Sequence, residues 1–236
     1  MSTAPERTRL RALIIQHEEP TPPGLITPWL RERGYEVETL RIDEQDPHDL
    51  DPRAYELIVS LGSEFGAYQD DIEWIKHEMD FLAEAQEADV PILGVCFGGQ
   101  ILARVLGGDV FRSDKEEIGW LPVGTSDPDL VPDGPWFQWH FDTFTAPPGA
   151  TVVAANEAGP QAYVIGRSLG LQFHPEVTTE IMDEWVRVYR HELDEHGVDP
   201  DALLAETHER AREHNRNTRK LLDSFIERVA RPRERA

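Results

Sequence analysis

The chain has 236 residues, 39% of them hydrophobic, and a formal net charge of −22 at pH 7. This length and composition predict one large globular domain, while the charge argues against non-specific nucleic-acid binding. The sequence lacks a long apolar run, a signal-peptide core before Arg11 and a second cysteine, which predicts a cytoplasmic protein without membrane spans or intrachain disulfides. Whether the acidity reflects a high-salt cytoplasm stays open.

Short apolar runs alternate with helical patterns in the first part of the chain. Strands are predicted at 11–16, 35–40, 55–60 and 90–93, and helices at 22–34, 72–88 and 100–106. The third strand ends in the turn Leu61-Gly62-Ser63. Strands that alternate with helices predict an α/β fold: a doubly wound, mostly parallel sheet flanked by helices.

The only cysteine lies in the segment Gly94-Val95-Cys96-Phe97-Gly98-Gly99-Gln100, between a predicted strand and a predicted helix. A nucleophile at such a turn is exposed at the C-terminal end of the strand. The N–H groups and the dipole of the helix start favour the thiolate form of cysteine. The alternative is a buried cysteine that acts only as a small hydrophobic residue. The surrounding glycines and a histidine far downstream favour the nucleophile.

After Gly108 the pattern changes to short strand-like runs separated by Pro and Gly, near 110–111, 118–123, 137–139, 152–154 and 162–165. They predict a small antiparallel excursion before the sheet resumes at 169–173. That strand ends in His174-Pro175-Glu176, because proline cannot continue it. Parallel strands share one edge at their C-terminal ends, so His174 and Glu176 are expected to face Cys96 as base and orienting carboxylate.

The two motifs resemble those of class I glutamine amidotransferases, G-x-C-x-G-x-Q followed by H-P-E. The segments Glu117-Ile118-Gly119-Trp120 and Trp139-His140-Phe141-Asp142-Thr143-Phe144 are similar to segments of GMP-synthase-like stand-alone amidotransferases, although Phe141 replaces a common glycine. The resemblance covers about 10–189. It implies catalytic Cys96, His174 and Glu176, oxyanion-hole donors Gly62 and Phe97, and substrate-binding Gln100 and Asp142.

Neither the motifs nor the resemblance implies a cofactor or a metal, and His140 is interpreted as a structural histidine. The resemblance implies a glutaminase that gives glutamate and ammonia. Since the chain carries no P-loop and no dinucleotide fingerprint, a separate synthetase would have to use the ammonia. A free-standing γ-glutamyl amide or peptide hydrolase with the same triad remains open. A non-catalytic regulatory module is a third interpretation, and the intact triad argues against it.

The amidotransferase domain is predicted at 10–195, after a helix at 177–192, and 196–236 is predicted as a long, charged C-terminal helical extension. The apolar stripe of this extension is predicted to consist of Leu204, His208, Ala211, Asn215, Thr218, Leu222, Phe225 and Val229, with His208 and His214 solvated. Two interpretations compete: a helix packed on its own domain, or an arm that binds a second copy or the synthetase through Leu221, Leu222, Phe225 and Ile226. The second predicts that deleting Asp199 to Ala236 leaves the triad assembled but weakens association.

Overall fold

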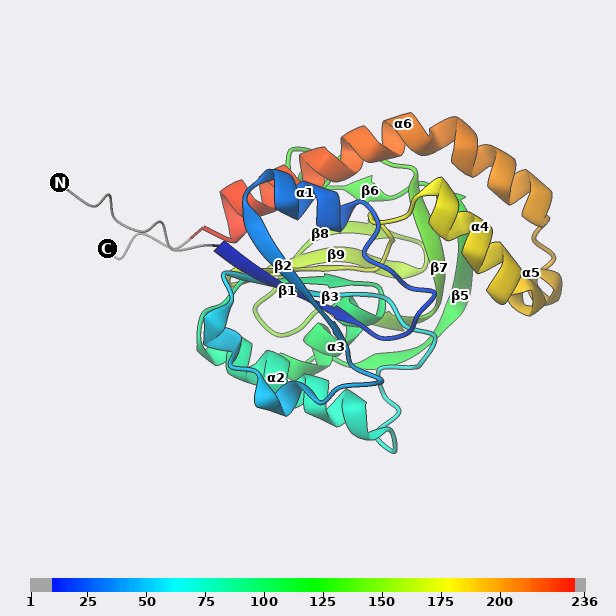
Figure 1. Cartoon of the computed structure of the whole chain (residues 1–236). Helices are drawn as coiled ribbons and strands as arrows, with labels where there is room; N and C mark the ends of the chain where they lie inside the picture. The colour runs from blue at the N-terminus through cyan, green and yellow to red at the C-terminus, as the bar shows by residue number, and fades with distance from the viewer. Residues whose placement is uncertain (1–9, 232–236) are drawn as a thin grey trace.

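A computed structural model describes residues 10–231 (Figure 1). The strands are β1 (Leu10–Gln16), β2 (Tyr35–Arg41), β3 (Leu57–Ser60), β4 (Ile92–Val95), β5 (Val110–Leu121), β6 (Gly124–Thr125), β7 (Trp136–Phe144), β8 (Thr151–Asn156), β9 (Gly159–Ile165) and β10 (Ser168–Leu171). The helices are α1 (Ile26–Glu32), α2 (Glu73–Glu87), α3 (Phe97–Val105), α4 (Thr179–Val188), α5 (Arg190–His196) and α6 (Pro200–Ser224). Two short 3₁₀ helices cover Pro47–Asp49 and Pro52–Ala54, and a π-helical turn, η3 (Phe225–Val229), continues α6.

The large sheet has the strand order β2-β1-β3-β4-β10-β9-β8-β6. Neighbours from β2 to β10 are parallel, while β9, β8 and β6 are antiparallel. This arrangement confirms the predicted α/β class with its mostly parallel sheet. The order of the strands reverses at β1 and β3, and ligands of such sheets bind outside the C-terminal strand ends near this point.

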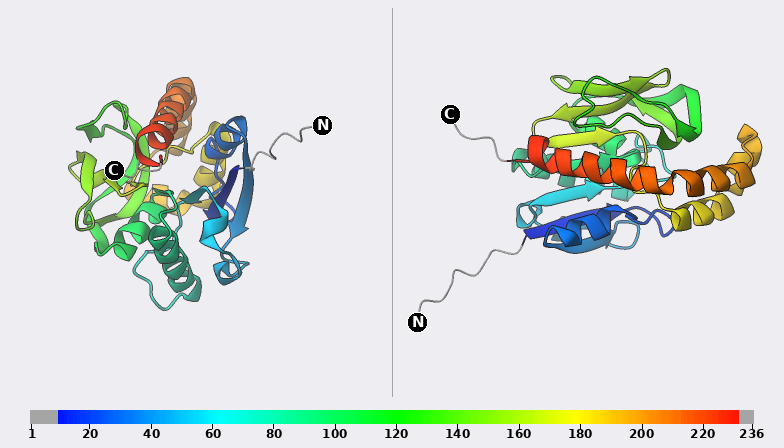
Figure 2. Two further views of the ribbon diagram at one scale, coloured as in Figure 1. Left: turned by 90° about the vertical axis from the view of Figure 1, so that its left-hand side faces the viewer. Right: turned by 90° about the horizontal axis from the view of Figure 1, so that it is seen from above.

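Helices cover both faces of the parallel strands, because side chains of successive strand residues point to opposite faces. Leu13 and Ile15 face the cluster that contains α2 and α3, whereas Ala12 and Ile14 face the cluster that contains α1, the end of α6 and η3. Figure 2 shows α6 lying along the molecule, on the same side of the sheet as α1. These two clusters form a layer on each face of the parallel strands, and a third cluster around Trp120, Phe137 and Trp185 joins the two-stranded sheet to α4.

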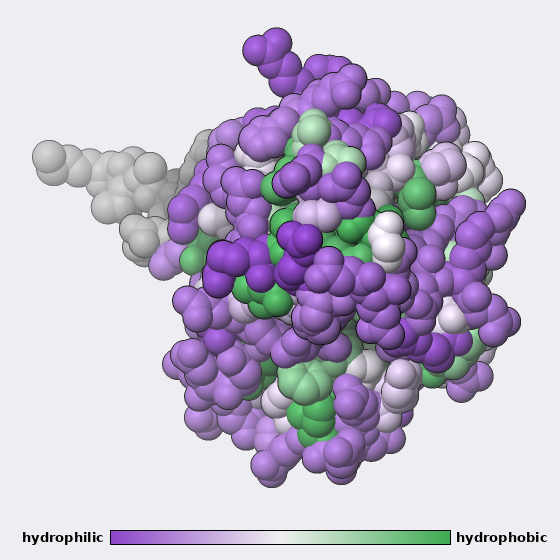
Figure 3. Space-filling view, turned by 90° about the vertical axis from the view of Figure 1, so that its right-hand side faces the viewer, coloured by the Kyte–Doolittle hydropathy of each residue, from purple (hydrophilic) through white to green (hydrophobic). Residues whose placement is uncertain are grey.

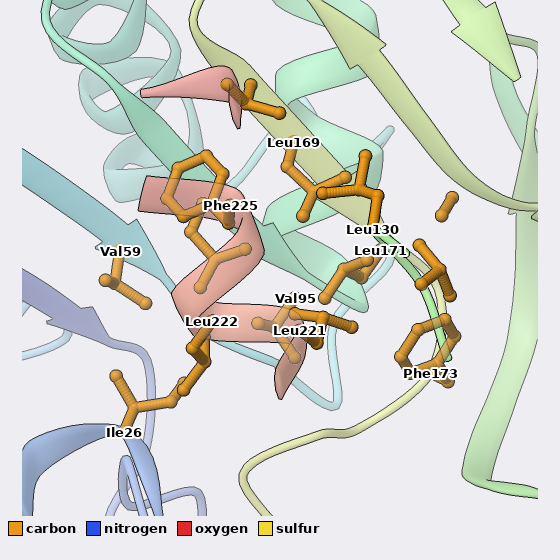
Figure 4. Packing of buried hydrophobic residues seen from close by; sticks show 14 of the residues in the cluster. Ile26, Val59, Val95, Leu130, Leu169, Leu171, Phe173, Leu221, Leu222 and Phe225 are labelled. Atoms are coloured by element: carbon orange, nitrogen blue, oxygen red, sulfur yellow. The ribbon is translucent and has the colours of Figure 1, made fainter. Parts of the chain in front are cut away.

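The apolar end of α6 is part of this core. Leu221, Leu222 and Phe225 are fully buried, and Figure 4 shows them among Val59, Val95 and Leu169 of the sheet. The interpretation of this end as an interaction arm for a second copy or a synthetase is therefore wrong, and so is the proposed dimer contact through it. The buried stripe differs as well: Thr207 and His214 are buried, whereas the predicted Leu204, His208, Ala211 and Asn215 are not. The expectation of a solvated His214 is therefore wrong.

Two further details differ from the prediction, one in the antiparallel part and one in the helical segment after β10. The runs near 110 and 118 form one strand, β5, with an irregularity between Arg112 and Glu117, and it pairs with β7 in a separate two-stranded sheet. The helix predicted at 177–192 is two helices, because Tyr189 departs from helical geometry with φ −100° and ψ 27°. No helix within residues 10–231 is long and apolar enough to cross a membrane.

Candidate active site

Cys96 lies between β4 and α3 in a backbone conformation that is rare for a residue with a side chain. Its φ of 52° and ψ of −108° describe a strained strand-to-helix turn, the geometry that exposes a nucleophile. Glycines let the helix start approach the sheet closely. A Cβ on Gly98 would lie 2.1 Å from the Ser60 carbonyl oxygen, and one on Gly99 would lie 2.3 Å from that of Leu171. Larger residues would therefore push α3 away from the sheet.

His174 and Glu176 follow β10, the strand beside β4. His174 Nδ1 lies 2.7 Å from Glu176 Oε1, and both side chains are buried. Burial by itself lowers the pKa of His174, but the negative charges of Glu176 and Cys96 raise that pKa well above its ordinary value. Nε2, the other ring nitrogen, has no hydrogen-bond partner among the described residues. It is the nitrogen that can exchange a proton with the thiol.

Gly62, two residues after the end of β3, lies against the side chains of His174 and Cys96. A Cβ on Gly62 would lie 3.0 Å from His174 Cε1 and 3.8 Å from Cys96 Cβ. Within residues 10–231, neither the Gly62 N–H nor the Phe97 N–H donates a hydrogen bond to a backbone carbonyl in a turn or loop. Both groups can therefore bind a ligand atom, which an oxyanion hole requires. Their role as the oxyanion donors stays a prediction.

A cavity of about 260 Å³ has Cys96, His174 and Gly62 in its wall. Its size suits a small molecule, since pockets for drug-sized ligands start at about 300 Å³. Aromatic side chains supply much of the remaining wall: Phe65, Tyr68, Trp139, Phe141, Trp185 and Tyr189. Figure 3 shows the side of the molecule toward which β1 runs, where hydrophobic residues gather across the middle of an otherwise hydrophilic face.

Gln100 and Asp142, the predicted substrate-binding residues, also line this cavity. The Gln100 side chain is only 3% exposed, and its Nε2 donates to the Asp142 carbonyl oxygen at 3.2 Å. Burial raises the pKa of the Asp142 carboxyl, which accepts a hydrogen bond from the Tyr68 hydroxyl at 3.3 Å. The structure thus brings the two residues together, with Gln100 holding the backbone of Asp142.

Gln172 and the backbone of Trp139 also contact Cys96, and neither contact is expected from the sequence motifs. Gln172 Nε2 lies 3.7 Å from Cys96 Sγ, and the Trp139 carbonyl oxygen lies 3.9 Å from the same sulfur. Gln172 could have been found, because it is a polar residue inside an otherwise apolar strand sequence that leads directly to His174. Nothing in the sequence points to a backbone carbonyl of β7.

His140 occupies the structural position that was expected. Its Nε2 lies 3.0 Å from Glu117 Oε2 and its Nδ1 lies 2.9 Å from the Asp142 carbonyl oxygen. Phe141 stacks on the ring of His196 in α5, with ring centroids 4.9 Å apart. Across the described part of the chain, no three His, Cys, Asp or Glu side chains are grouped so as to hold a metal ion.

Comparison with known proteins identifies the family. The family model for glutamine amidotransferase class-I matches residues 25–187. The chain belongs to this family. A glutamine amidotransferase of Thermotoga maritima has a similar structure, with a TM-score of 0.86 and 34% identity over 94% of this chain and 100% of that chain. A glutamine amidotransferase of Methylobacillus flagellatus gives a TM-score of 0.85 at 27% identity, over 96% of this chain and 97% of that chain.

The curated relatives are much longer proteins. GMP synthase [glutamine-hydrolyzing] of Thermosipho africanus is 31% identical over 164 residues, which cover 65% of this chain and 30% of that protein. The GMP synthase of Aeropyrum pernix is 33% identical over 127 residues, which cover 48% of this chain and 25% of that protein. The resemblance to the GMP-synthase-like branch of the family is therefore confirmed. The chain spans about a quarter to a third of the length of these relatives.

Proposed function

We propose that this protein hydrolyses the side-chain amide of glutamine to glutamate and ammonia, and that a separate synthetase uses the ammonia. The observation that carries the proposal is the meeting of Cys96, His174 and Glu176 at one sheet edge, with Gly62 in contact with the first two. Names of the curated relatives support it, since they describe GMP synthases that hydrolyse glutamine.

In the proposed mechanism the Cys96 sulfur attacks the amide carbon of glutamine. His174 accepts the thiol proton and then gives it to the nitrogen as the C–N bond breaks, so ammonia leaves and a thioester remains. Water then attacks the thioester carbon while His174 takes one of its protons. The C–S bond breaks, the sulfur recovers a proton and glutamate leaves.

Glu176 orients the imidazole and stabilises its protonated form through the 2.7 Å contact with Nδ1. The N–H groups of Gly62 and Phe97 are the proposed donors to the oxyanion, and such a donor contributes about 3–4 kcal/mol in the transition state. Gln100 and Asp142 are the proposed substrate residues, with the Asp142 carboxylate facing the α-ammonium group.

The test is glutamine hydrolysis by the wild type and by Cys96→Ala, with ammonia as the measured product. Labelling by an electrophilic glutamine analogue is followed by mass spectrometry in parallel. We expect Cys96→Ala to lose hydrolysis and labelling at an unchanged melting temperature. Full hydrolysis by the variant would overturn the mechanism.

A panel of γ-glutamyl amides separates the remaining alternatives. Faster release of larger amines than of ammonia would replace the glutaminase proposal by a γ-glutamyl hydrolase with the same triad. A wild-type protein that neither hydrolyses the panel nor takes up the label, alone or with its co-purifying partners, would indicate a regulatory module.

A further inference from the structure

A pair of neighbouring residues after β1 holds the turn that carries Gly62. His17 Nδ1 lies 3.0 Å from the Gly62 carbonyl oxygen, and the next residue, Glu18, accepts a hydrogen bond from the Ser63 hydroxyl. β1 and β3 are neighbours in the sheet, so these contacts connect two adjacent strand ends. Neither residue belongs to the proposed triad or to the proposed substrate contacts.

The other ring nitrogen of His17 contacts Glu78 of α2. Its Nε2 lies 2.8 Å from Glu78 Oε2, while Glu78 Oε1 accepts a hydrogen bond from the Ser60 hydroxyl at 2.7 Å. All three side chains are fully buried. Both ring nitrogens of His17 face acceptors, a carbonyl and a carboxylate. Two donors are needed there, so the geometry favours an imidazolium paired with a carboxylate.

The direction in which the pKa of His17 is shifted agrees with this geometry. Burial by itself lowers the pKa of the imidazole, but Glu78, together with Glu18 and the Gly62 carbonyl, raises that pKa above its ordinary value. A buried ion pair is a weak source of stability, because apolar residues of similar size can replace it without loss. The pair therefore has to be explained by what it positions.

Both peptide groups beside Gly62 are fixed. The Gly98 N–H donates to the Leu61 carbonyl oxygen at 2.9 Å, which holds the peptide that contains the Gly62 N–H. His17 holds the following peptide through the Gly62 carbonyl. The same imidazole packs edge-on against the ring of Phe97, with centroids 4.6 Å apart. One side chain thus contacts both residues whose N–H groups are the proposed oxyanion donors.

We infer that His17, paired with Glu78, is a positioning residue that sets the Gly62 and Phe97 peptides for the oxyanion of the reaction. The inference rests on the proposed function for its catalytic consequence, and on the contacts alone for its structural one. Because an oxyanion exists only in the transition state and intermediate, a displaced donor lowers kcat and leaves KM nearly unchanged.

Two substitutions separate the two contacts of His17. In His17→Asn the amide nitrogen can replace Nδ1 and donate to the Gly62 carbonyl. In His17→Gln the longer side chain reaches toward residue 78, as Nε2 does, and leaves the Gly62 carbonyl without its donor. Both are made in a Glu78→Gln background and compared with that background, so that no buried carboxylate loses a charged partner. Leu40→Ala, in the edge strand β2, is the control for lost stability away from the site.

We expect His17→Gln to lower kcat by about 10²-fold, the loss that a misplacement of about 1 Å can cause, and to change KM by less than about three-fold. His17→Asn should retain most of kcat, and Leu40→Ala should lower the melting temperature with kcat unchanged. Equal kcat values for His17→Asn and His17→Gln, or a loss confined to KM, would overturn the inference.

A second measurement does not depend on activity. In ¹H–¹⁵N spectra of the full chain, both variants lose the ring current of the imidazole, but only His17→Gln also loses the donor to the Gly62 carbonyl. His17→Gln should therefore shift the amide signals of Gly62, Ser63 and Phe97 more than His17→Asn does. Shifts in His17→Gln that are no larger than those in His17→Asn would overturn the positioning role even if the enzyme is active. Larger shifts in His17→Gln, in a protein that hydrolyses no glutamine, would support the positioning role and contradict the proposed function instead.

Discussion

The buried histidines His17, His174 and His214 differ in what their ring nitrogens contact, and their pKa values do not all shift in the same direction. His17 and His174 each face a buried glutamate, and the pKa of each ring is raised in spite of burial. His214 of α6 lies edge-on to Trp120 and Trp136, and neither of its ring nitrogens has a hydrogen-bond partner within residues 10–231. Burial lowers the pKa of His214 to about 4, so this ring is neutral in the folded protein.

The neutral state of His214 predicts a loss of stability in mild acid. Its pKa is about 4 in the folded protein and 6.5 ordinarily, so the unfolded chain binds more protons between these values. The unfolding free energy is therefore unaffected by His214 above pH 6.5. It falls as the pH drops toward 4, because the unfolded chain binds a proton at His214 that the folded protein does not bind. We expect His214→Leu to remove about 2 kcal/mol of the fall in unfolding free energy between pH 7 and pH 5.

Urea unfolding of both proteins at the two pH values measures this difference. His208→Gln, an exposed change on the same helix, is the matched control and should retain the wild-type pH dependence. An identical fall in His214→Leu and the wild type would mean that other groups cause the acid sensitivity.

At the scale of the element, α6 supports the loop that carries the proposed base. The Thr218 hydroxyl donates to the Pro175 carbonyl oxygen at 2.7 Å, between His174 and Glu176 in the sequence. Trp120 Nε1 donates to the Thr207 hydroxyl at 2.9 Å, so α6 is also fixed to β5. The helix therefore connects the main sheet, the two-stranded sheet and the active-site loop.

These contacts reverse the expectation for a C-terminal deletion. Removing Asp199 to Ala236 would expose Val59, Val95 and Leu169 of the sheet, so we expect an insoluble or unfolded product rather than an assembled triad. Thr218→Val is the milder test. It leaves the buried Pro175 carbonyl unpaired, at a cost of about 1–3 kcal/mol, and should slow labelling of Cys96 by the glutamine analogue.

Thermal melting and labelling rates of Thr218→Val are compared with those of Glu213→Ala, an exposed change on α6. A soluble, fully labelled deletion product would show that the sheet and the triad do not need this helix.

For the whole molecule, the charge of −22 sets the response to salt. Repulsion among surface carboxylates destabilises the compact state, and added salt screens it. Ion pairs such as Arg228–Asp127 and Arg41–Asp43 stabilise the folded state, and salt weakens them. Surface pairs contribute little, about 0–1 kcal/mol each, so their loss is the smaller effect. We therefore expect the melting temperature to rise between low and molar KCl.

Calorimetry across a KCl series at pH 7 tests this expectation, and the rise should shrink at a pH low enough to neutralise the carboxylates. A melting temperature that falls steadily with added KCl would show that ion pairs outweigh the net repulsion.

The sequence by itself determined the α/β class, the Cys96 turn and the strand that leads to His174, because these depend on local patterns. Apolar runs bounded by glycine or proline specify strands and their ends, and parallel strands share one edge for their C-terminal ends. Both motifs follow from residues close together in the chain.

Only the tertiary structure decided that the apolar end of α6 packs on the sheet and that His17 and Glu78 hold the Gly62 turn. Helical periodicity shows that Leu221, Leu222 and Phe225 share a face, but not whether that face meets the sheet or another protein. His17 and Glu78 are 61 positions apart, and their contact exists because β1 and α2 pack together. Local sequence patterns carry no information about such pairs, since their distance depends on the packing of the elements that carry them.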